Sequence, residues 1–210
     1  LLFSLMPMSV SAASEPYIIV DGYRYENVNS DLSGNGWYWD AESKALVLDN
    51  YSGGSILTNV DMRITALTGT TNTIYSASSY HTCIKSEGTL GITANGNITL
   101  VDINKGDKVI GISAKALNLY VGQKGTLTCD NYVNTLIYTE DKSDINCYGS
   151  IISYGRLLIA GNDTTIAVNG ASSSIKALNR KTVSTAVAID GNCDISGEGK
   201  IVIGTDENAY

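Results

Sequence analysis

One repeating arrangement of apolar residues constrains the fold of this chain more than any other feature. Ile56, Ile84 and Ile112 are evenly spaced, so the interval from the first to the second recurs from the second to the third. Each of them leads segments in which apolar and polar residues alternate, which is the pattern of a strand with one buried face. The residues that we expect to point inward in these and the later segments are Met62, Ile64, Ile74, Leu90, Ile92, Ile98, Leu100, Leu117, Leu119, Leu127, Cys129, Leu157, Ile159, Ile166, Val168, Cys193, Ile195, Ile201 and Ile203. The chain therefore contains a repeat of three short strands.

A unit of three short strands cannot bury its apolar side alone, whereas stacked copies enclose one continuous interior. The repeat therefore predicts an all-β fold, a single-stranded right-handed parallel β-helix of about six coils with an N-terminal cap. The composition agrees, because 21 glycines, 13 tyrosines and a single phenylalanine are typical of strands and turns rather than of long helices. A β-sandwich of short antiparallel strands is the alternative, since alternation alone does not fix parallel pairing.

The repeat becomes irregular in the second half of the chain. The interval from Ile137 to Ile152 is much shorter than the regular one, and the interval from Ile152 to Val187 is longer. We interpret the short interval as a shortened coil. We interpret the long one as an inserted loop around ASSSIKALNRKTVS, positions 171–184.

The N-terminal sequence LLFSLMPMSVSAA combines an apolar run with small residues near Ala12 and Ala13, which is typical of a secretory signal peptide. We expect residues 1–13 to be a signal-peptide remnant, 14–54 to form N-terminal capping strands and 55–210 to form the β-helix. No second capping segment follows the last strand, so we expect the helix to be truncated at its C-terminus. No later apolar run approaches the ~20 residues that span a membrane. The expected location is outside the cell, either secreted or on the cell surface.

The two tryptophans of the chain, Trp37 and Trp39, lie one residue apart directly before the first coil. In a strand both would point to one face while Tyr38 points to the other. The open end of a solenoid exposes apolar side chains and needs a cap, so the two indoles are expected to form a lid. The alternative is a platform on which a sugar stacks.

The charge of the chain argues against nucleic acid as a partner. Fourteen Lys and Arg residues against 21 Asp and Glu residues give a formal net charge of −7, and the four arginines are scattered along the chain. Binding to a phosphate backbone needs a basic patch, which the sequence does not provide.

Four cysteines occur in a chain that we expect to be exported, at positions 83, 129, 147 and 193. The interval from Cys83 to Cys129 equals that from Cys147 to Cys193. Two coils of stacking would hold such residues about 9 to 10 Å apart, too far for a disulfide. Small buried thiols are the favoured interpretation, and one bridge between Cys129 and Cys147 is the alternative.

The sequence carries few groups that could perform chemistry. His81 is its single histidine and lies in the turn sequence SYHTC, so a catalytic triad or a zinc site has little support. Calcium is the one candidate cofactor, because oxygen ligands are closely spaced in two acidic turns. The candidate ligands are Asp102, Asn104 and Asp107 in DINKGD, and Glu140, Asp141 and Asp144 in TEDKSD. The alternative is that these are ordinary polar corners of a solenoid.

The segment GNGWYWDAESKALVLDNYSGG, together with the strands GTLGI, GTLTC, GRLLI and GKIVI, resembles the bacterial secreted right-handed β-helix proteins described as carbohydrate-binding domains. These are similar in shape to the pectate-lyase-like superfamily. The resemblance covers nearly all of the chain after residue 13. It implies a polysaccharide or a cell-surface glycan as the partner.

The resemblance does not extend to a catalytic set. Pectate-lyase-like enzymes hold calcium in an acidic cluster beside an Arg or Lys, and glycosidase relatives place several Asp residues on consecutive coils. No strand here has a repeated Asp-x-Asp or an Arg between carboxylates. We therefore predict an exported, non-catalytic carbohydrate-binding β-helix with no catalytic residues. A structural or adhesive surface segment of a larger protein is the alternative, followed by a polysaccharide lyase or glycoside hydrolase.

Tyrosines mark the expected sugar-binding surface. Tyr120 and Tyr148 each follow an inward residue and are separated by the same interval as Ile56 and Ile84, so we expect their rings to lie outside on neighbouring coils. Rungs ~4.8 Å apart would let the two rings form one strip for the apolar face of a sugar. Tyr132 and Tyr138 could extend this strip. The alternative is an aromatic ladder that only stabilises the stack.

Overall fold

The computed structural model describes residues 14–26, 28–76, 79–103, 109–130, 133–154, 157–179 and 189–205. All regular elements in these ranges are β-strands, β1 to β20, which confirms the predicted all-β fold. Within the same ranges no helix is long and apolar enough to cross a membrane.

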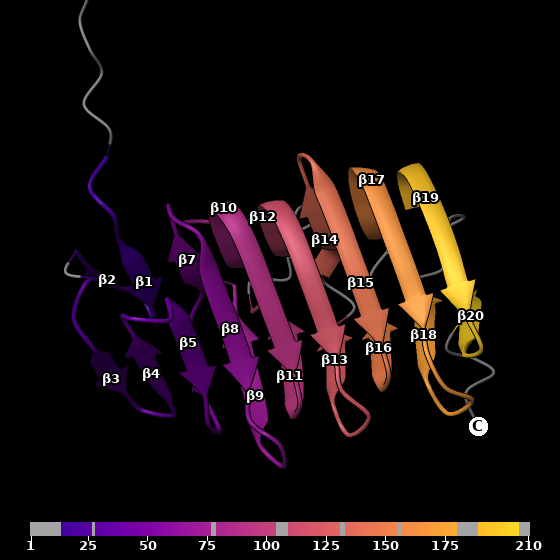
Figure 1. Cartoon of the computed structure of the whole chain (residues 1–210), viewed down its shortest axis with the longest axis horizontal. Helices are drawn as coiled ribbons and strands as arrows, with labels where there is room; N and C mark the ends of the chain where they lie inside the picture. Colours follow the sequence, from indigo (N-terminus) through magenta and orange to yellow (C-terminus); the bar gives the residue numbers. More distant parts are fainter. Residues whose placement is uncertain are drawn as a thin grey trace, which may run out of the picture.

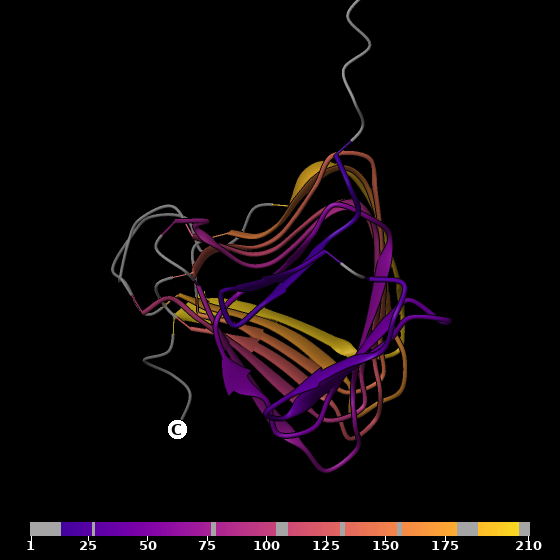
Figure 2. The ribbon, with the colours of Figure 1, turned by 90° about the vertical axis from the view of Figure 1, so that its left-hand side faces the viewer.

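The strands stack as a β-solenoid whose triangular cross-section is seen along the stack in Figure 2. Three faces repeat in each coil, and most neighbouring strands pair in parallel. The long strands turn a corner and contribute one half to the first face and the other half to the second. Figure 1 shows the strands side by side in chain order.

The first face contains β7 (Ile56–Thr58), the first parts of β10 (Thr82–Ala94) and β12 (Val109–Val121), β14 (Val133–Thr139), and the first parts of β17 (Leu157–Val168) and β19 (Ile189–Gly197). The second face contains β5 (Ala45–Leu48), β8 (Met62–Ala66), the later parts of β10 and β12, β15 (Lys142–Cys147), and the later parts of β17 and β19. The third face contains β6 (Ser52–Gly53), β9 (Thr71–Tyr75), β11 (Asn97–Val101), β13 (Thr126–Cys129), β16 (Ser150–Ser153), β18 (Ser174–Asn179) and β20 (Lys200–Thr205). The repetition of the same three faces along the stack confirms the predicted coiled architecture.

The register of the strands confirms that the regularly spaced isoleucines stack on one another in neighbouring coils. Ile84 pairs with Ile56 on one side and with Ile112 on the other. All three side chains are buried, and so are the predicted inward residues of the middle coils that the structure describes. Complete burial of one such aliphatic side chain contributes roughly 1.5–3 kcal/mol, so the stacked columns are a main source of the stability of the fold.

The predicted irregularity of the later coils was wrong in its details. The residue that stacks on Ile112 is Ile137, and the next is Ile159, so each of these two coils is slightly shorter than the one before it. Ile152 belongs to a different face, where it pairs with Thr128, and the interval from Ile137 to Ile152 therefore does not measure a coil. Apolar side chains that point outward caused this error, because alternation alone does not reveal the face.

The predicted inserted loop is also incorrect over part of its length. Residues 174–179 form β18, which pairs in parallel with β16 and β20. Ile175 and Ala177 of this strand are buried in the interior. Residues 180–184 of the predicted loop lie outside the described residues.

The N-terminal end of the stack is built differently, from antiparallel strands. β1 (Ile18–Val20) pairs with β2 (Tyr23–Tyr25) and β7, while β4 (Trp37–Asp40) pairs with β3 (Leu32–Gly34) and β5. The parallel ladders begin with β5 on β8 and β6 on β9, inside the segment 14–54.

Trp37 and Trp39 point inward from β4, and Tyr38 points outward as expected. Both indoles belong to the buried apolar cluster, and Trp39 Nε1 donates a hydrogen bond of 3.0 Å to the Val28 carbonyl. Trp37 packs its ring edge-on against Tyr25 at 5.6 Å. The hypothesis of a sugar platform at Trp37 and Trp39 is therefore incorrect, because neither indole offers a face to solvent.

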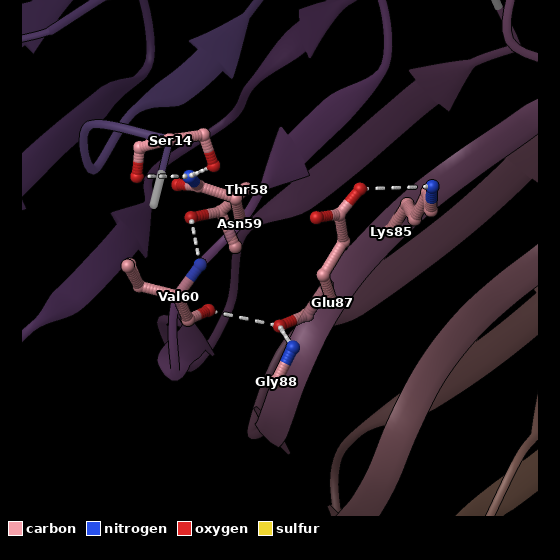
Figure 3. Close-up of polar contacts among 8 residues, drawn as sticks. Ser14, Thr58, Asn59, Val60, Lys85, Glu87 and Gly88 are labelled. Atoms are coloured by element: carbon pink, nitrogen blue, oxygen red, sulfur yellow. Dashed lines mark hydrogen bonds and ion pairs between the residues drawn. The ribbon is translucent and has the colours of Figure 1, made fainter. Parts of the chain in front are cut away.

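Polar contacts tie the chain before β1 to a corner of the stack (Figure 3). The Asn59 side-chain amide donates to Ser14 Oγ at 3.0 Å. The Asn59 side-chain oxygen accepts from the Tyr17 N–H at 2.8 Å. In the next coil, Ser86 Oγ donates to the Val60 carbonyl at 2.9 Å. Side chains thus satisfy backbone groups where the strands bend between the first and second faces.

Candidate functional site

A groove of about 560 Å³ crosses the outer surface of the second face. It passes over β8, β10, β12 and β15, which run side by side in Figure 1. The residues that line it are Ser43, Lys44, Asp61, Met62, Arg63, Thr89, Gly91, Ile92, Thr93, Asn118, Leu119, Tyr120, Asp144 and Asn146. This is a surface feature of the stacked coils and lies outside their apolar interior.

The groove follows from strand register. Arg63 pairs with Gly91, Gly91 with Asn118, and Asn118 with Asp144, so these four residues form one outward column across four coils. Outward positions recur every second residue, and Tyr120 with Asn146 belongs to the next outward column. Residues distant in the sequence are thus brought into one line along the stack.

Gly91 forms the middle of the groove floor and gives the groove its depth. A Cβ atom added at Gly91 would lie 3.1 Å from Cγ of Arg63. The Arg63 side chain therefore lies over the space that the glycine leaves open. Its Nη2 donates a hydrogen bond of 2.7 Å to the Ser43 carbonyl, which holds the guanidinium at this end of the groove.

Carboxylates in and beside the groove already have partners within the protein. Asp144 Oδ2 lies 3.0 Å from Lys142 Nζ, and Asp61 Oδ1 accepts the Thr89 N–H at 2.7 Å. Asp40 accepts hydrogen bonds from the Ser43 hydroxyl and from its N–H. These bonds lower the pKa of the Asp40 carboxyl, and nearby Arg63 contributes a smaller effect in the same direction.

Tyr120 and Tyr148 come together as the sequence predicts. Their ring centroids are 5.5 Å apart with the planes tilted by 41°, and the residues are 40% and 37% exposed. Tyr120 pairs with Asn146 in register, so Tyr148 lies diagonally beside it at the end of β15. The N–H of Tyr148 donates to the Val121 carbonyl at 2.8 Å. Tyr120 also lines the groove, and Tyr148 lies against it just outside the lining residues.

Tyr138, which was expected to extend the strip, does not join this pair. Tyr138 is exposed on the first face, where it pairs with Ser113 and Ala160, whereas Tyr120 lies on the second face. Tyr132 lies outside the described residues. Among the described residues, the predicted strip therefore consists of Tyr120 and Tyr148.

The acidic turn TEDKSD does not form the predicted calcium site, whereas of the predicted ligands in DINKGD only Asp102 is described. Asp102 is buried and accepts a hydrogen bond of 2.8 Å from Ser76 Oγ, while Asn104 and Asp107 lie outside the described residues. Glu140 and Asp141 are exposed at a corner, and Asp144 is paired with Lys142. Among the described residues, no three His, Cys, Asp or Glu side chains gather as a metal site.

The cysteines are thiols, and no disulfide joins them. Cys83, Cys129 and Cys147 are buried, as the favoured interpretation predicts, and Cys193 is partly exposed. Burial raises the pKa of the Cys83 and Cys147 thiols, which keeps both protonated and unreactive. The alternative bridge between Cys129 and Cys147 is not formed.

His81 is an exposed turn residue in the left-handed region, with φ of 48°. This agrees with the view of SYHTC as an ordinary turn.

Sequence reasoning missed most of the groove. Arg63, Gly91, Asn118 and Asn146 have no motif in common, and they become neighbours only when the coils are aligned. A signal was nevertheless present, because Arg63 and Gly91 are separated by the regular repeat interval and each follows an inward residue. No protein-family model, curated protein or solved structure matches this chain.

Proposed function

We propose that this protein is an exported, non-catalytic carbohydrate-binding β-helix whose binding surface is the groove on the second face. The observation that carries the proposal is a pair of exposed tyrosine rings, 5.5 Å apart, of which Tyr120 lines a groove of about 560 Å³. Aromatic rings beside fixed polar groups suit sugars, which have an apolar face and a rim of hydroxyl groups.

Polar side chains along the groove suit the rim of such a ligand. Asn118 and Asn146 provide amide donors and acceptors beside Tyr120. Arg63 has further N–H donors besides the one bound to Ser43. From Lys44 to Asp144 the groove crosses four rung spacings, about 19 Å, which favours an extended chain over a single sugar.

The placement of the groove carboxylates favours binding over cleavage. Asp61 and Asp144 lie three rungs apart, about 14 Å, while the two carboxyl groups of glycosidases are usually within ~10 Å of each other. Asp144 is also neutralised by Lys142. Export is proposed from the apolar sequence of residues 1–13 alone.

A glycan array with the purified protein tests the proposal, followed by affinity measurements on a glycan that binds. The double variant Tyr120→Ala, Tyr148→Ala should weaken binding at least about tenfold, since the loss of a central aromatic anchor commonly costs more than about 1 kcal/mol of binding energy. Tyr138→Ala is the matched control, because it removes an equally exposed tyrosine from another face. Absence of binding to plant, host and microbial glycans would instead favour a structural or adhesive segment.

A second variant tests the groove itself. Gly91→Gln should fill the floor and weaken binding, with a small loss of stability because the Arg63 Cγ atom, 3.1 Å from the added Cβ, has to shift slightly. Thr99→Gln, an outward change on the third face, is its control. If the two variants bound the glycan with equal affinity, the groove would not be the binding surface.

A further inference from the structure

The charges around the groove balance one another. Cationic and acidic side chains occur there in equal number when both the lining residues and their bonded neighbours are included. The cationic residues are Lys44, Arg63 and Lys142, and the acidic ones are Asp40, Asp61 and Asp144. These side chains therefore offer no excess of positive charge to a polyanion.

Most of these charges are also engaged inside the protein. Lys142 and Asp144 form an ion pair, and Arg63 is held by a carbonyl oxygen. Asp61 accepts a backbone N–H. An acidic ligand would have to compete with these contacts, and the rest of the molecule would repel it, since the chain carries a formal net charge of −7.

Beyond these balanced charges, the groove offers a ligand uncharged hydrogen-bonding groups and aromatic surface. Asn118, Asn146 and Thr93 provide the hydrogen-bonding groups, and Tyr120 provides the aromatic surface. We infer that the groove takes a neutral glycan, an uncharged polyhydroxylated chain, in preference to an acidic one. This inference rests on the proposed function and adds the class of the ligand to it.

The test compares glycans that differ in charge alone. Neutral hexasaccharides of glucose, mannose and galactose are titrated against the full chain, next to the same oligosaccharides with their primary alcohols oxidised to carboxylates. We expect the neutral member of a binding pair to bind at least about tenfold more tightly, and its affinity to change less than about twofold between low and high salt, because salt screens only charged attraction.

Charge variants in the groove show whether these side chains set the preference. Asp144→Asn removes one negative charge from the groove and should reduce the difference in affinity between the neutral and oxidised glycans. Arg63→Gln removes one positive charge and should increase this difference in affinity. Glu87→Gln and Lys85→Gln are the matched controls, because they change the net charge equally at an exposed ion pair on another part of the coil.

The outcomes separate the inference from the proposed function. An oxidised glycan that binds as tightly as its neutral counterpart, or more tightly, overturns the inference and leaves carbohydrate binding in place. Groove variants that shift the preference no more than their controls also overturn it. Failure of every neutral and oxidised glycan to bind overturns both.

Discussion

The middle of the stack and its last coil contain the same kind of residue in the same register, yet they differ in burial. Ile166 on β17 pairs with Ile195 on β19, and their exposed fractions are 1% and 52%. Ile203 on β20 is 59% exposed, whereas Ala177, its partner on β18, is buried. Inward residues are therefore buried by the next rung rather than by their own coil, as expected of a solenoid.

At the other end of the stack, antiparallel strands take the place of the next rung. Trp37 and Trp39 lie in the same buried cluster as the first coils. Burial of the interior therefore depends on what covers each end of the stack. Single substitutions at the two ends and in the middle can test this dependence.

Trp39→Ala should cause the largest loss of stability, about 3–5 kcal/mol. The change leaves a cavity between the N-terminal strands and the first coil, and it leaves the Val28 carbonyl without its indole donor. Urea unfolding measures the effect. Tyr38→Ala, the exposed neighbour, should change the free energy of unfolding by less than about 1 kcal/mol. Similar losses for the two variants would contradict the buried position of the indole.

Ile166→Ala should cost about 2–4 kcal/mol, and Ile195→Ala about 1 kcal/mol or less. The two residues are register partners, so the difference between them measures what a covering rung contributes. Thermal unfolding of both variants checks it. If Ile195→Ala were as costly as Ile166→Ala, then another part of the protein must cover the last coil.

The reactivity of the cysteines should show the same difference in burial between the middle coils and the last coil. In the native protein Cys193 should react with a thiol reagent at least about tenfold faster than Cys147, because Cys147 is buried and Cys193 is partly exposed, while burial raises the pKa of both thiols. Mass spectrometry of the digested, alkylated protein measures both sites. After unfolding without reductant all four cysteines should react, and fewer than four would indicate a disulfide.

The smallest effect should be found at Asp40, the last residue of β4. Its lowered pKa means that the carboxylate contributes stability above about pH 3.8, its usual pKa, and loses that contribution as the pH falls through the lower folded-state pKa. Side-chain NMR titration should place the midpoint below 3.8, and Ser43→Ala should raise it by removing the hydroxyl donor. A midpoint that Ser43→Ala leaves unchanged would rule out this cause.

The coils could be predicted from the sequence because burial leaves a pattern there. Ile56, Ile84 and Ile112 mark one column, and the alternation around them gives the inward faces. The same reasoning failed at Ile152, because an apolar residue on the outside resembles one on the inside. The groove was harder to predict, since outward residues such as Arg63 and Asn118 follow no period of their own. The Tyr120 and Tyr148 pair was accessible because each follows an inward residue, although the assumed repeat interval was too long here: Tyr120 pairs with Asn146, and the two rings meet diagonally.

The unequal lengths of the coils have a consequence for how such a protein can change. From Ile112 through Ile137 to Ile159 each coil is shorter than the one before, yet the strands of neighbouring coils stay paired in parallel. Most of the difference lies in the connections between strands: 102–108 separates β11 from β12, whereas only 130–132 separates β13 from β14. Insertions and deletions at corners are therefore local events, and a foreign peptide grafted into a corner should alter one coil while the recognition surface on the next keeps its geometry.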